Sequence, residues 1–184
     1  SVVSNSKPIV SAYHFTTLSP NIGMVRLDDA RDFVMADLPG LIEGASQGVG
    51  LGFQFLRHVE RTRVVLHLVD MSGIEGNAPY TQYRKILDEL GQYDETILNR
   101  PHIVVPTKMD MPDSEENLVK FRQEVAADSG LPVQPEIMPI SALTREGVQP
   151  LMRLTADLLA TAPVPESYRP VVEKVSNDKT YDFK

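Results

Sequence analysis

The second half of the chain alternates short apolar runs with longer amphipathic segments. The apolar runs have the length of buried strands and are followed by turn residues; they cover residues 64–70, 102–107 and 136–140. Apolar side chains recur at helical spacing in the segments 79–93, 114–129 and 147–161. Strands joined through helices run parallel, because each crossover returns the chain to the same end of the sheet. The alternation therefore predicts an α/β domain of three layers with a mostly parallel sheet.

The first half adds an antiparallel element to this plan. Two apolar runs, 23–27 and 31–36, are separated only by Asp28-Asp29-Ala30, which is typical of a tight hairpin turn. Residues 51–60 carry apolar side chains on one face and are expected to form a further helix. The predicted sheet thus contains one antiparallel hairpin strand beside its parallel strands.

Size and composition fit one globular domain. The 184 residues contain 42% hydrophobic and 23% charged side chains, close to globular averages. We expect the domain to span 1–162 and a proline-interrupted linker or tail at 163–184 to lead toward a further C-terminal domain. The net charge of −7 disfavours DNA as a partner. The chain has no cysteine, signal peptide or membrane-length apolar run, which favours a cytoplasmic protein without membrane contact.

A carboxylate and a glycine turn follow the second apolar run. Asp37-Leu38-Pro39-Gly40 has the form by which nucleoside triphosphatases hold magnesium and sense a γ-phosphate, since the Gly40 amide can approach a phosphate with no Cβ in the way. A plain strand-ending turn is the alternative for this pattern taken alone. Four glycines between positions 44 and 52 favour a mobile switch in the segment that follows.

Two further motifs follow later strands and are typical of guanine recognition. The first is Thr107-Lys108-Met109-Asp110, and the second is Ser141-Ala142-Leu143. A carboxylate at Asp110 accepts from both the ring N–H and the exocyclic amine of guanine, which adenine does not offer, so an ATPase is disfavoured. The alternative is an ordinary charged loop. The order of the three motifs, each at the carboxyl end of a predicted strand, favours a nucleotide site.

An earlier segment supplies hydroxyl groups. Thr16 and Thr17 precede the first predicted strand, and a threonine hydroxyl there can complete the oxygen shell of Mg²⁺. Propensity alone also places paired threonines before strands. The four histidines show no metal-ligand spacing, and His67 is interpreted as a packed strand residue.

Longer stretches of the chain resemble the GTPase domain of the Obg family over residues 1 to about 162. They are Tyr13-His14-Phe15-Thr16-Thr17-Leu18, Pro20-Asn21-Ile22-Gly23-Met24-Val25, Asp37-Leu38-Pro39-Gly40-Leu41-Ile42-Glu43-Gly44-Ala45, Gly48-Val49-Gly50-Leu51-Gly52 and Phe55-Leu56-Arg57-His58. The resemblance implies a P-loop NTPase-like fold and a cytoplasmic GTP-hydrolysing switch that acts in assembly of the large ribosomal subunit. GTP, GDP and that subunit are then the expected partners, with Mg²⁺ as cofactor.

The resemblance also implies roles for particular residues. Thr17 and Asp37 would bind magnesium, and Gly40 would sense the γ-phosphate. The remaining expected nucleotide contacts come from four short segments: Phe15, Thr16, Leu18 and Ser19; Leu38 and Pro39; Thr107, Lys108, Met109 and Asp110; and Ser141, Ala142 and Leu143.

The chain departs from the family pattern at two places. Asparagine is usual where this chain has Thr107, and one hydroxyl donor replaces two amide donors and an acceptor. The glycine-rich phosphate loop with its lysine is expected immediately before Ser1 and is not in the 184 residues. The strand leading into that loop would lie between the strands ending at Asp37 and Asp70, so we expect a gap there of about two strand spacings, near 10 Å.

Two functional hypotheses follow. The first is a GTP-hydrolysing switch, in which the 184 residues alone are impaired because they lack the phosphate loop. Leu41 stands where many GTPases place a water-orienting glutamine, which predicts slow turnover or a catalytic group from elsewhere, such as Glu43 or Gln47. The alternative is a non-catalytic GTPase-like protein-interaction module. Retention of Asp37 and Asp110 favours the first.

Overall fold

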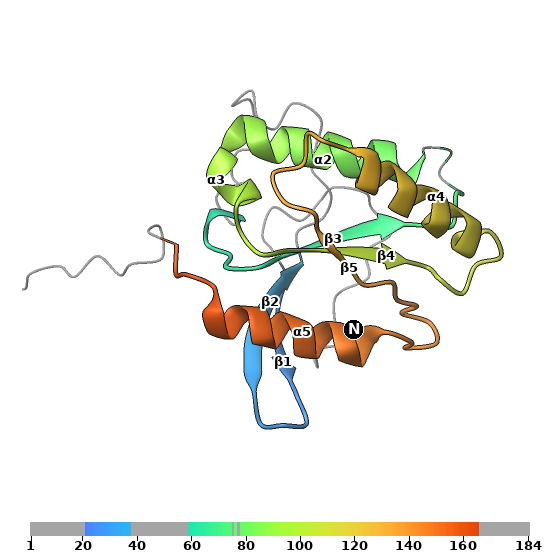
Figure 1. Cartoon of the computed structure of the whole chain (residues 1–184). Helices are drawn as coiled ribbons and strands as arrows, with labels where there is room; N and C mark the ends of the chain where they lie inside the picture. The colour runs from blue at the N-terminus through green and yellow to red at the C-terminus, as the bar shows by residue number, and fades with distance from the viewer. Residues whose placement is uncertain (1–20, 38–58, 75, 77, 166–184) are drawn as a thin grey trace, which may run out of the picture.

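The computed structural model describes residues 21–37, 59–74, 76 and 78–165 (Figure 1). Its elements are β1 (Asn21–Arg26), β2 (Asp32–Asp37), β3 (Val65–Asp70), α2 (Pro79–Tyr93), α3 (Glu95–Leu98), β4 (His102–Thr107), α4 (Ser114–Ala127), β5 (Glu136–Ile137) and α5 (Val148–Thr161). Most of the helix predicted at 51–60 lies outside the described residues. The alternation of strands and helices after residue 64 is confirmed.

Three parallel strands form the main sheet. Their order is β3-β4-β5, with Val65 opposite His102, Asp70 opposite Thr107 and Ile103 opposite Glu136. Successive side chains of β4 point to opposite faces, as a pleated strand requires. Val104 therefore joins one core cluster, while Ile103 and Val105 join another.

Each face of this sheet is covered by helices. On one face, α2 and α4 pack on β3 and β4 through Tyr83, Leu87, Leu118, Phe121 and Val125, all of them buried. On the other face, α5 packs on β4 through Val148, Leu151 and Met152. The three predicted layers are thus present, and Figure 1 shows α2 and α5 on opposite sides of the strands.

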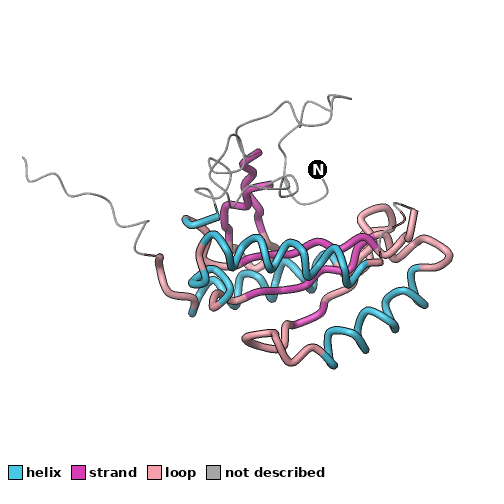
Figure 2. Tube along the Cα trace, turned by 90° about the horizontal axis from the view of Figure 1, so that it is seen from above, coloured by secondary structure: helices cyan, strands magenta, loops and turns pink. Residues whose placement is uncertain are grey.

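The hairpin forms a sheet of its own. β1 and β2 pair antiparallel from Asn21 opposite Asp37 to Arg26 opposite Asp32. Ala30 takes the left-handed conformation at φ 67°, which closes the three-residue turn predicted from the sequence. Among the described strands none joins β2 to β3, and Figures 1 and 2 show the hairpin standing away from the parallel sheet. The division falls where the sequence predicts a gap.

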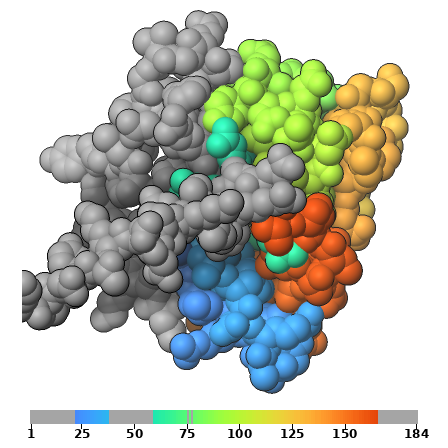
Figure 3. Space-filling model, turned by 90° about the vertical axis from the view of Figure 1, so that its left-hand side faces the viewer, coloured from blue at the N-terminus to red at the C-terminus, as the bar shows by residue number. Residues whose placement is uncertain are grey.

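The hairpin packs against α5. Val25 is 2% exposed, and with Leu27, Phe33 and Met35 it belongs to the apolar cluster of α5. Figure 3 shows the blue surface of the hairpin meeting the orange-red surface of α5. The opposite face of the hairpin carries exposed apolar side chains, among them Ile22 and Val34.

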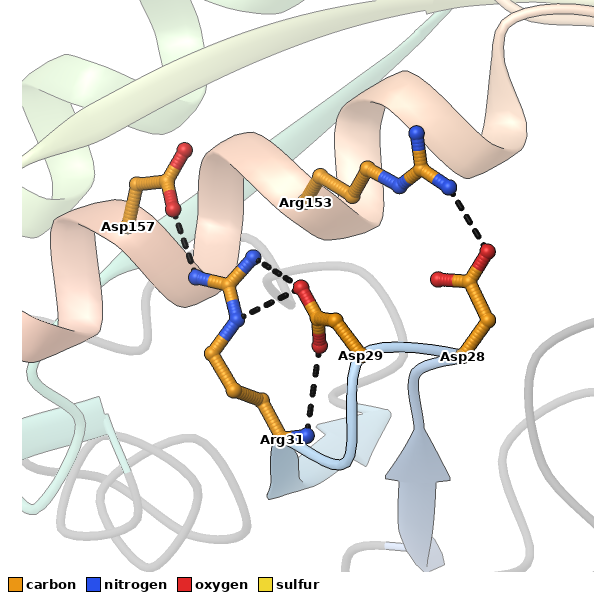
Figure 4. Close-up of polar contacts among 5 residues, drawn as sticks. All are labelled: Asp28, Asp29, Arg31, Arg153 and Asp157. Carbon is orange, nitrogen blue, oxygen red and sulfur yellow. Dashed lines mark hydrogen bonds and ion pairs between the residues drawn. The ribbon is translucent and has the colours of Figure 1, made fainter.

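Charged side chains at the hairpin turn add ion pairs to this packing (Figure 4). The Arg31 guanidinium lies 2.6 Å from Asp29 and 2.5 Å from Asp157 of α5, and Arg153 of α5 lies 2.7 Å from Asp28. These side chains are exposed, and such pairs contribute only about 0–1 kcal/mol each. The apolar contacts therefore contribute most of what holds the hairpin on α5.

Two elements end at least two residues earlier than predicted. The strand expected at 136–140 is regular only to Ile137, although the amides of Met138 and Ile140 still donate to β4 at 2.9 and 2.8 Å; Pro139 between them has no N–H to donate. The helix expected to reach residue 129 stops at Ala127, because the Asp128 carboxylate accepts from the Gly130 amide at 2.8 Å and turns the chain. Within the described residues no helix is long and apolar enough to cross a membrane.

Candidate functional site

The carboxyl ends of the parallel strands bring three segments of the chain together. Asp70 ends β3, Thr107 ends β4 directly beside it, and Ile140 follows β5 on the far side of β4. Ligands of parallel α/β sheets bind at this edge, because the loops that follow the strands converge there. Two of the three predicted nucleotide motifs begin at this edge.

Thr107 ties the ends of β3 and β4 together. Its hydroxyl donates to the Val69 carbonyl at 3.2 Å, and its own carbonyl accepts from the Met71 amide at 3.2 Å. The one hydroxyl proton is therefore used within the sheet, which leaves only lone pairs for a ligand. An asparagine would have a further donor at this position.

Lys108 is placed by a left-handed backbone turn and an ion pair. Its φ is 60°, a conformation uncommon outside glycine, so the surrounding contacts must hold it. Its ammonium group lies 2.5 Å from the Asp70 carboxylate. Partial burial raises the pKa of Asp70, but hydrogen bonds from Lys108 and Ser72 outweigh this effect, so the pKa lies below its usual value. The Asp70 carboxylate is therefore ionised at neutral pH.

Asp110 is oriented by a buried serine from the other motif. The Ser141 hydroxyl donates to Asp110 Oδ1 at 2.6 Å and accepts from the Thr144 amide at 3.1 Å. Ser141 is 1% exposed, whereas Asp110 is exposed. One carboxylate oxygen is thus fixed by the protein, and the remaining lone pairs of Asp110 face solvent, where a ligand can donate to them.

Residues near the Asp70 and Asp110 carboxylates stabilise the loop that follows β4. The Met109 side chain packs on the α2–α4 core, and its amide donates to Ile140 at 3.3 Å. The buried Ser114 hydroxyl contacts the carbonyls of Met109 and Met111 at 3.0 and 2.7 Å. Met109 therefore anchors the motif in the core, and its predicted contact with a nucleotide stays a prediction.

The loop after β5 is shaped by one glycine. Gly147 has φ 72°, and a Cβ there would lie 2.3 Å from the Pro139 carbonyl oxygen. This close approach lets the Ser141 amide donate to Glu146 at 3.1 Å and closes the loop. Ala142 and Leu143 are exposed at its tip. No described residue bonds the Ala142 amide, which stays accessible to a ligand.

The predicted phosphate end of the site is described only at Asp37. This residue ends β2 and is exposed, and no group in the described ranges bonds its carboxylate. It lies on the hairpin sheet, which is separate from the sheet of β4, and the loop after β4 carries Lys108 and Asp110. The other predicted residues there, Phe15 to Ser19 and Leu38 to Gly40, lie outside the described residues.

The donor set fits magnesium in a nucleotide complex. No cluster of three metal-binding side chains occurs among the described residues. Magnesium usually keeps several waters and takes one or two carboxylates together with phosphate oxygens, so a complete protein cage is not expected. The exposed Asp37 carboxylate suits this kind of site.

Asp70 is the residue that the sequence interpretation did not assign. The sequence predicted a strand ending there, but gave the aspartate no role. Its position at the end of a buried strand, like that of Asp37 and of Thr107, was the available signal. Its partner Lys108 lies 38 positions later and becomes visible only with the strand register.

The fold and this edge of the sheet define the chain as a P-loop GTPase-type domain. Solved structures with the same fold include an Aquifex aeolicus Era variant bound to GDP and AlF4⁻, with a TM-score of 0.59, 22% identity and coverage of 88% of this chain and 49% of that one. Translation elongation factor SelB of Methanococcus maripaludis, bound to a GTP analogue, gives a TM-score of 0.56 at 22% identity and covers 80% of this chain and 29% of that one.

Sequence relatives are far more similar. Residues 1–108 match the family described as 50S ribosome-binding GTPase. The chain is 98% identical over 184 residues to the GTPase Obg of Leuconostoc citreum and 59% identical over 184 residues to that of Ligilactobacillus salivarius. Each match covers the whole of this chain but only 42% of the length of the relative. The chain belongs to the Obg family of GTPases.

Proposed function

We propose that the protein containing this chain binds guanine nucleotides and hydrolyses GTP to GDP and phosphate as a molecular switch. The observation that carries the proposal is the pairing of the two base-recognition motifs: Ser141 orients Asp110 at 2.6 Å while Lys108 stands beside it on the same sheet edge. The similarity to proteins named GTPase Obg supports it.

Guanine specificity follows from the Asp110 carboxylate. Its free lone pairs accept from the ring N–H and the exocyclic amine of guanine, whereas adenine presents a ring acceptor at the first of these positions. The Lys108 stem lies along the base plane, since four methylenes offer an apolar surface below a charged head. The Ala142 amide donates to the same base from the other loop.

The phosphate end relies on residues from the earlier motifs. Asp37 and Thr17 hold Mg²⁺, which neutralises charge on the phosphates when it is bound. The Gly40 amide donates to the γ-phosphate, so the segment after Asp37 takes a different position once that phosphate leaves. Leu41 cannot orient a water molecule, so turnover is slow unless a partner or another group of the segment, such as Glu43 or Gln47, supplies this function.

We further propose that the switch acts on the large ribosomal subunit in the cytoplasm. The matching family is described by its binding to the 50S ribosome. One solved structure of similar fold is Era in complex with MgGDPNP and a segment of 16S ribosomal RNA. The chain itself carries a net charge of −7, so contact with RNA must come from a local patch or another domain.

The test is hydrolysis of GTP and ATP by the protein at the full length of its relatives (the full-length protein), with and without Mg²⁺. We expect phosphate release from GTP alone, and only with the metal. Asp37→Asn should reduce it strongly, whereas the matched variant Asp32→Asn, at the exposed start of the same strand, should not. Guanine-nucleotide binding without phosphate release would support the non-catalytic interaction module instead.

A further inference from the structure

The Asp70 carboxylate bridges two segments at the edge of the sheet. Its Oδ2 lies 2.5 Å from Lys108 Nζ, and its Oδ1 accepts from the Ser72 amide at 2.7 Å. The Asp70 side chain is 19% exposed and that of Lys108 is 49% exposed. Asp70 is thus the more rigid member of the pair, because it belongs to β3 and its side chain accepts from the Ser72 amide.

The fold places Asp70 beside the point at which Lys108 leaves the sheet. Asp70 lies opposite Thr107 in the parallel register, so Lys108 is the first residue beyond the paired strands. Its left-handed backbone is held by the Lys108 carbonyl, which accepts from Met111 at 3.0 Å, and by the Met109 amide, which donates to Ile140 at 3.3 Å. The backbone therefore fixes where the side chain starts, and Asp70 fixes where it ends.

A lysine side chain has four rotatable bonds and many accessible rotamers. An exposed lysine without a partner would lose this freedom each time it packed along a base, and that loss would weaken binding. A carboxylate that pairs with the ammonium group restricts the side chain before the ligand binds. It leaves the apolar methylene stem, which would contact the base, uncovered. The geometry suits a preorganised stacking platform.

We propose that Asp70 is a positioning residue that holds Lys108 in the orientation that packs against guanine. The inference rests on the proposed guanine-nucleotide site and adds a residue from β3, which neither recognition motif contains. A purely structural role of Asp70 would act through the Ser72 amide. These two roles can be separated, because an asparagine keeps an oxygen acceptor for Ser72 but removes the charge that pairs with Lys108.

The experiment is a double-mutant cycle on GDP affinity in the full-length protein. Fluorescence titration of a labelled GDP is carried out on the unsubstituted protein, Asp70→Asn, Lys108→Ala and the double variant. GDP is used so that the result does not depend on the γ-phosphate contacts. Asp88→Asn is the matched control, because it breaks an exposed ion pair with Arg84 on α2, away from the site.

We expect Asp70→Asn to weaken GDP binding about tenfold, within the range of couplings measured between contacting side chains. In the Lys108→Ala background the same substitution should change the dissociation constant less than about twofold. The Asp88→Asn control should bind like the unsubstituted protein. Thermal unfolding and circular dichroism verify that each variant is folded, and Asp70→Ser, with a hydroxyl acceptor for Ser72, replaces Asp70→Asn if that variant does not fold.

Two results overturn the inference. An unchanged GDP affinity in Asp70→Asn shows that Lys108 needs no positioning, and an equal loss in both Lys108 backgrounds shows that Asp70 acts through the fold. Failure of the unsubstituted full-length protein to bind GDP refutes the proposed function itself and is therefore distinct from both.

Discussion

Lowering the pH should destabilise the domain through His67, which is buried, and His102, which is partly buried. His67 is 6% exposed, and among the described residues neither of its ring nitrogens has a hydrogen-bond partner; within the same ranges Nε2 of His102 has none either. The ring centroids of the two histidines lie 5.5 Å apart, and the Tyr83 ring is tilted by 45° with its centroid 4.9 Å from that of His67. Burial, together with the charge of His102, lowers the pKa of His67 to about 3, and burial lowers the pKa of His102 to about 4.

The sign follows from the protons that each state binds. Both histidines stay neutral in the folded state down to about pH 4, while in the unfolded chain they take up protons below about pH 6.5. Their contribution to stability is therefore complete above pH 6.5 and is lost as the pH falls toward the folded pKa values. Between the unfolded and folded pKa values, each histidine lowers the free energy of unfolding by about 1.4 kcal/mol per pH unit. The free energy of unfolding should therefore fall by about 3–4 kcal/mol between pH 7 and pH 5.

The assay is urea denaturation from pH 7 to pH 5, compared with the double variant His67→Phe/His102→Phe. Phenylalanine keeps an aromatic ring beside Tyr83 and has no nitrogen to protonate, so this variant should lose most of the pH dependence. His58→Phe serves as the control, because it changes a histidine other than His67 and His102. His14 is the remaining histidine of the chain. Equal pH dependence of the double variant and the unsubstituted protein would refute the argument.

Three further substitutions test the site. In the full-length protein, Gly40→Ala should weaken binding of a GTP analogue far more than that of GDP, because the added methyl obstructs only the γ-phosphate; equal losses would indicate a folding role. Thr107→Asn should tighten GDP binding about twofold to tenfold, the value of one added hydrogen bond, and titration showing unchanged or weaker binding would argue against it. Gly147→Ala should lower the free energy of unfolding by at least about 2 kcal/mol, since a left-handed φ is strained for alanine and its Cβ would overlap the Pro139 carbonyl; a smaller change in urea denaturation would mean that the loop can relax.

The elements that the sequence predicted best are those with a local cause. The bounds of α2 at Pro79–Tyr93 and of β4 at His102–Thr107 agree with the prediction, because proline marks the start of the first and a continuous apolar run defines the second. The short helix α3 was missed. Its four residues are too few to show a periodicity, and its N-cap is Asp94, whose carboxylate accepts from the Thr96 amide at 2.9 Å.

The site was predictable where its chemistry lies in short motifs. Lys108, Asp110 and Ser141 were proposed from two segments, and the structure brings these segments together at one edge of the sheet. The partner of Lys108 was not predictable, because the register of two parallel strands decides which side chain lies beside it. The hydrogen bond from the Thr107 hydroxyl to the Val69 carbonyl likewise depends on that register. The roles of Phe15 to Ser19 and of Leu38 to Gly40 remain predictions.

Recognition of guanine by Asp110 is the central claim, and Asp110→Asn tests it most directly. In competition binding with GTP and XTP, the full-length Asp110→Asn protein should shift its preference toward XTP, because an amide donates to the carbonyl that replaces the exocyclic amine. Exchange of one polar partner contributes about 1–3 kcal/mol, which changes the ratio of the two affinities roughly fivefold to 150-fold. Asp113→Asn, three positions along the same loop and without a side-chain cap bond, should leave the preference unchanged. An unaltered preference for GTP in Asp110→Asn would contradict the account.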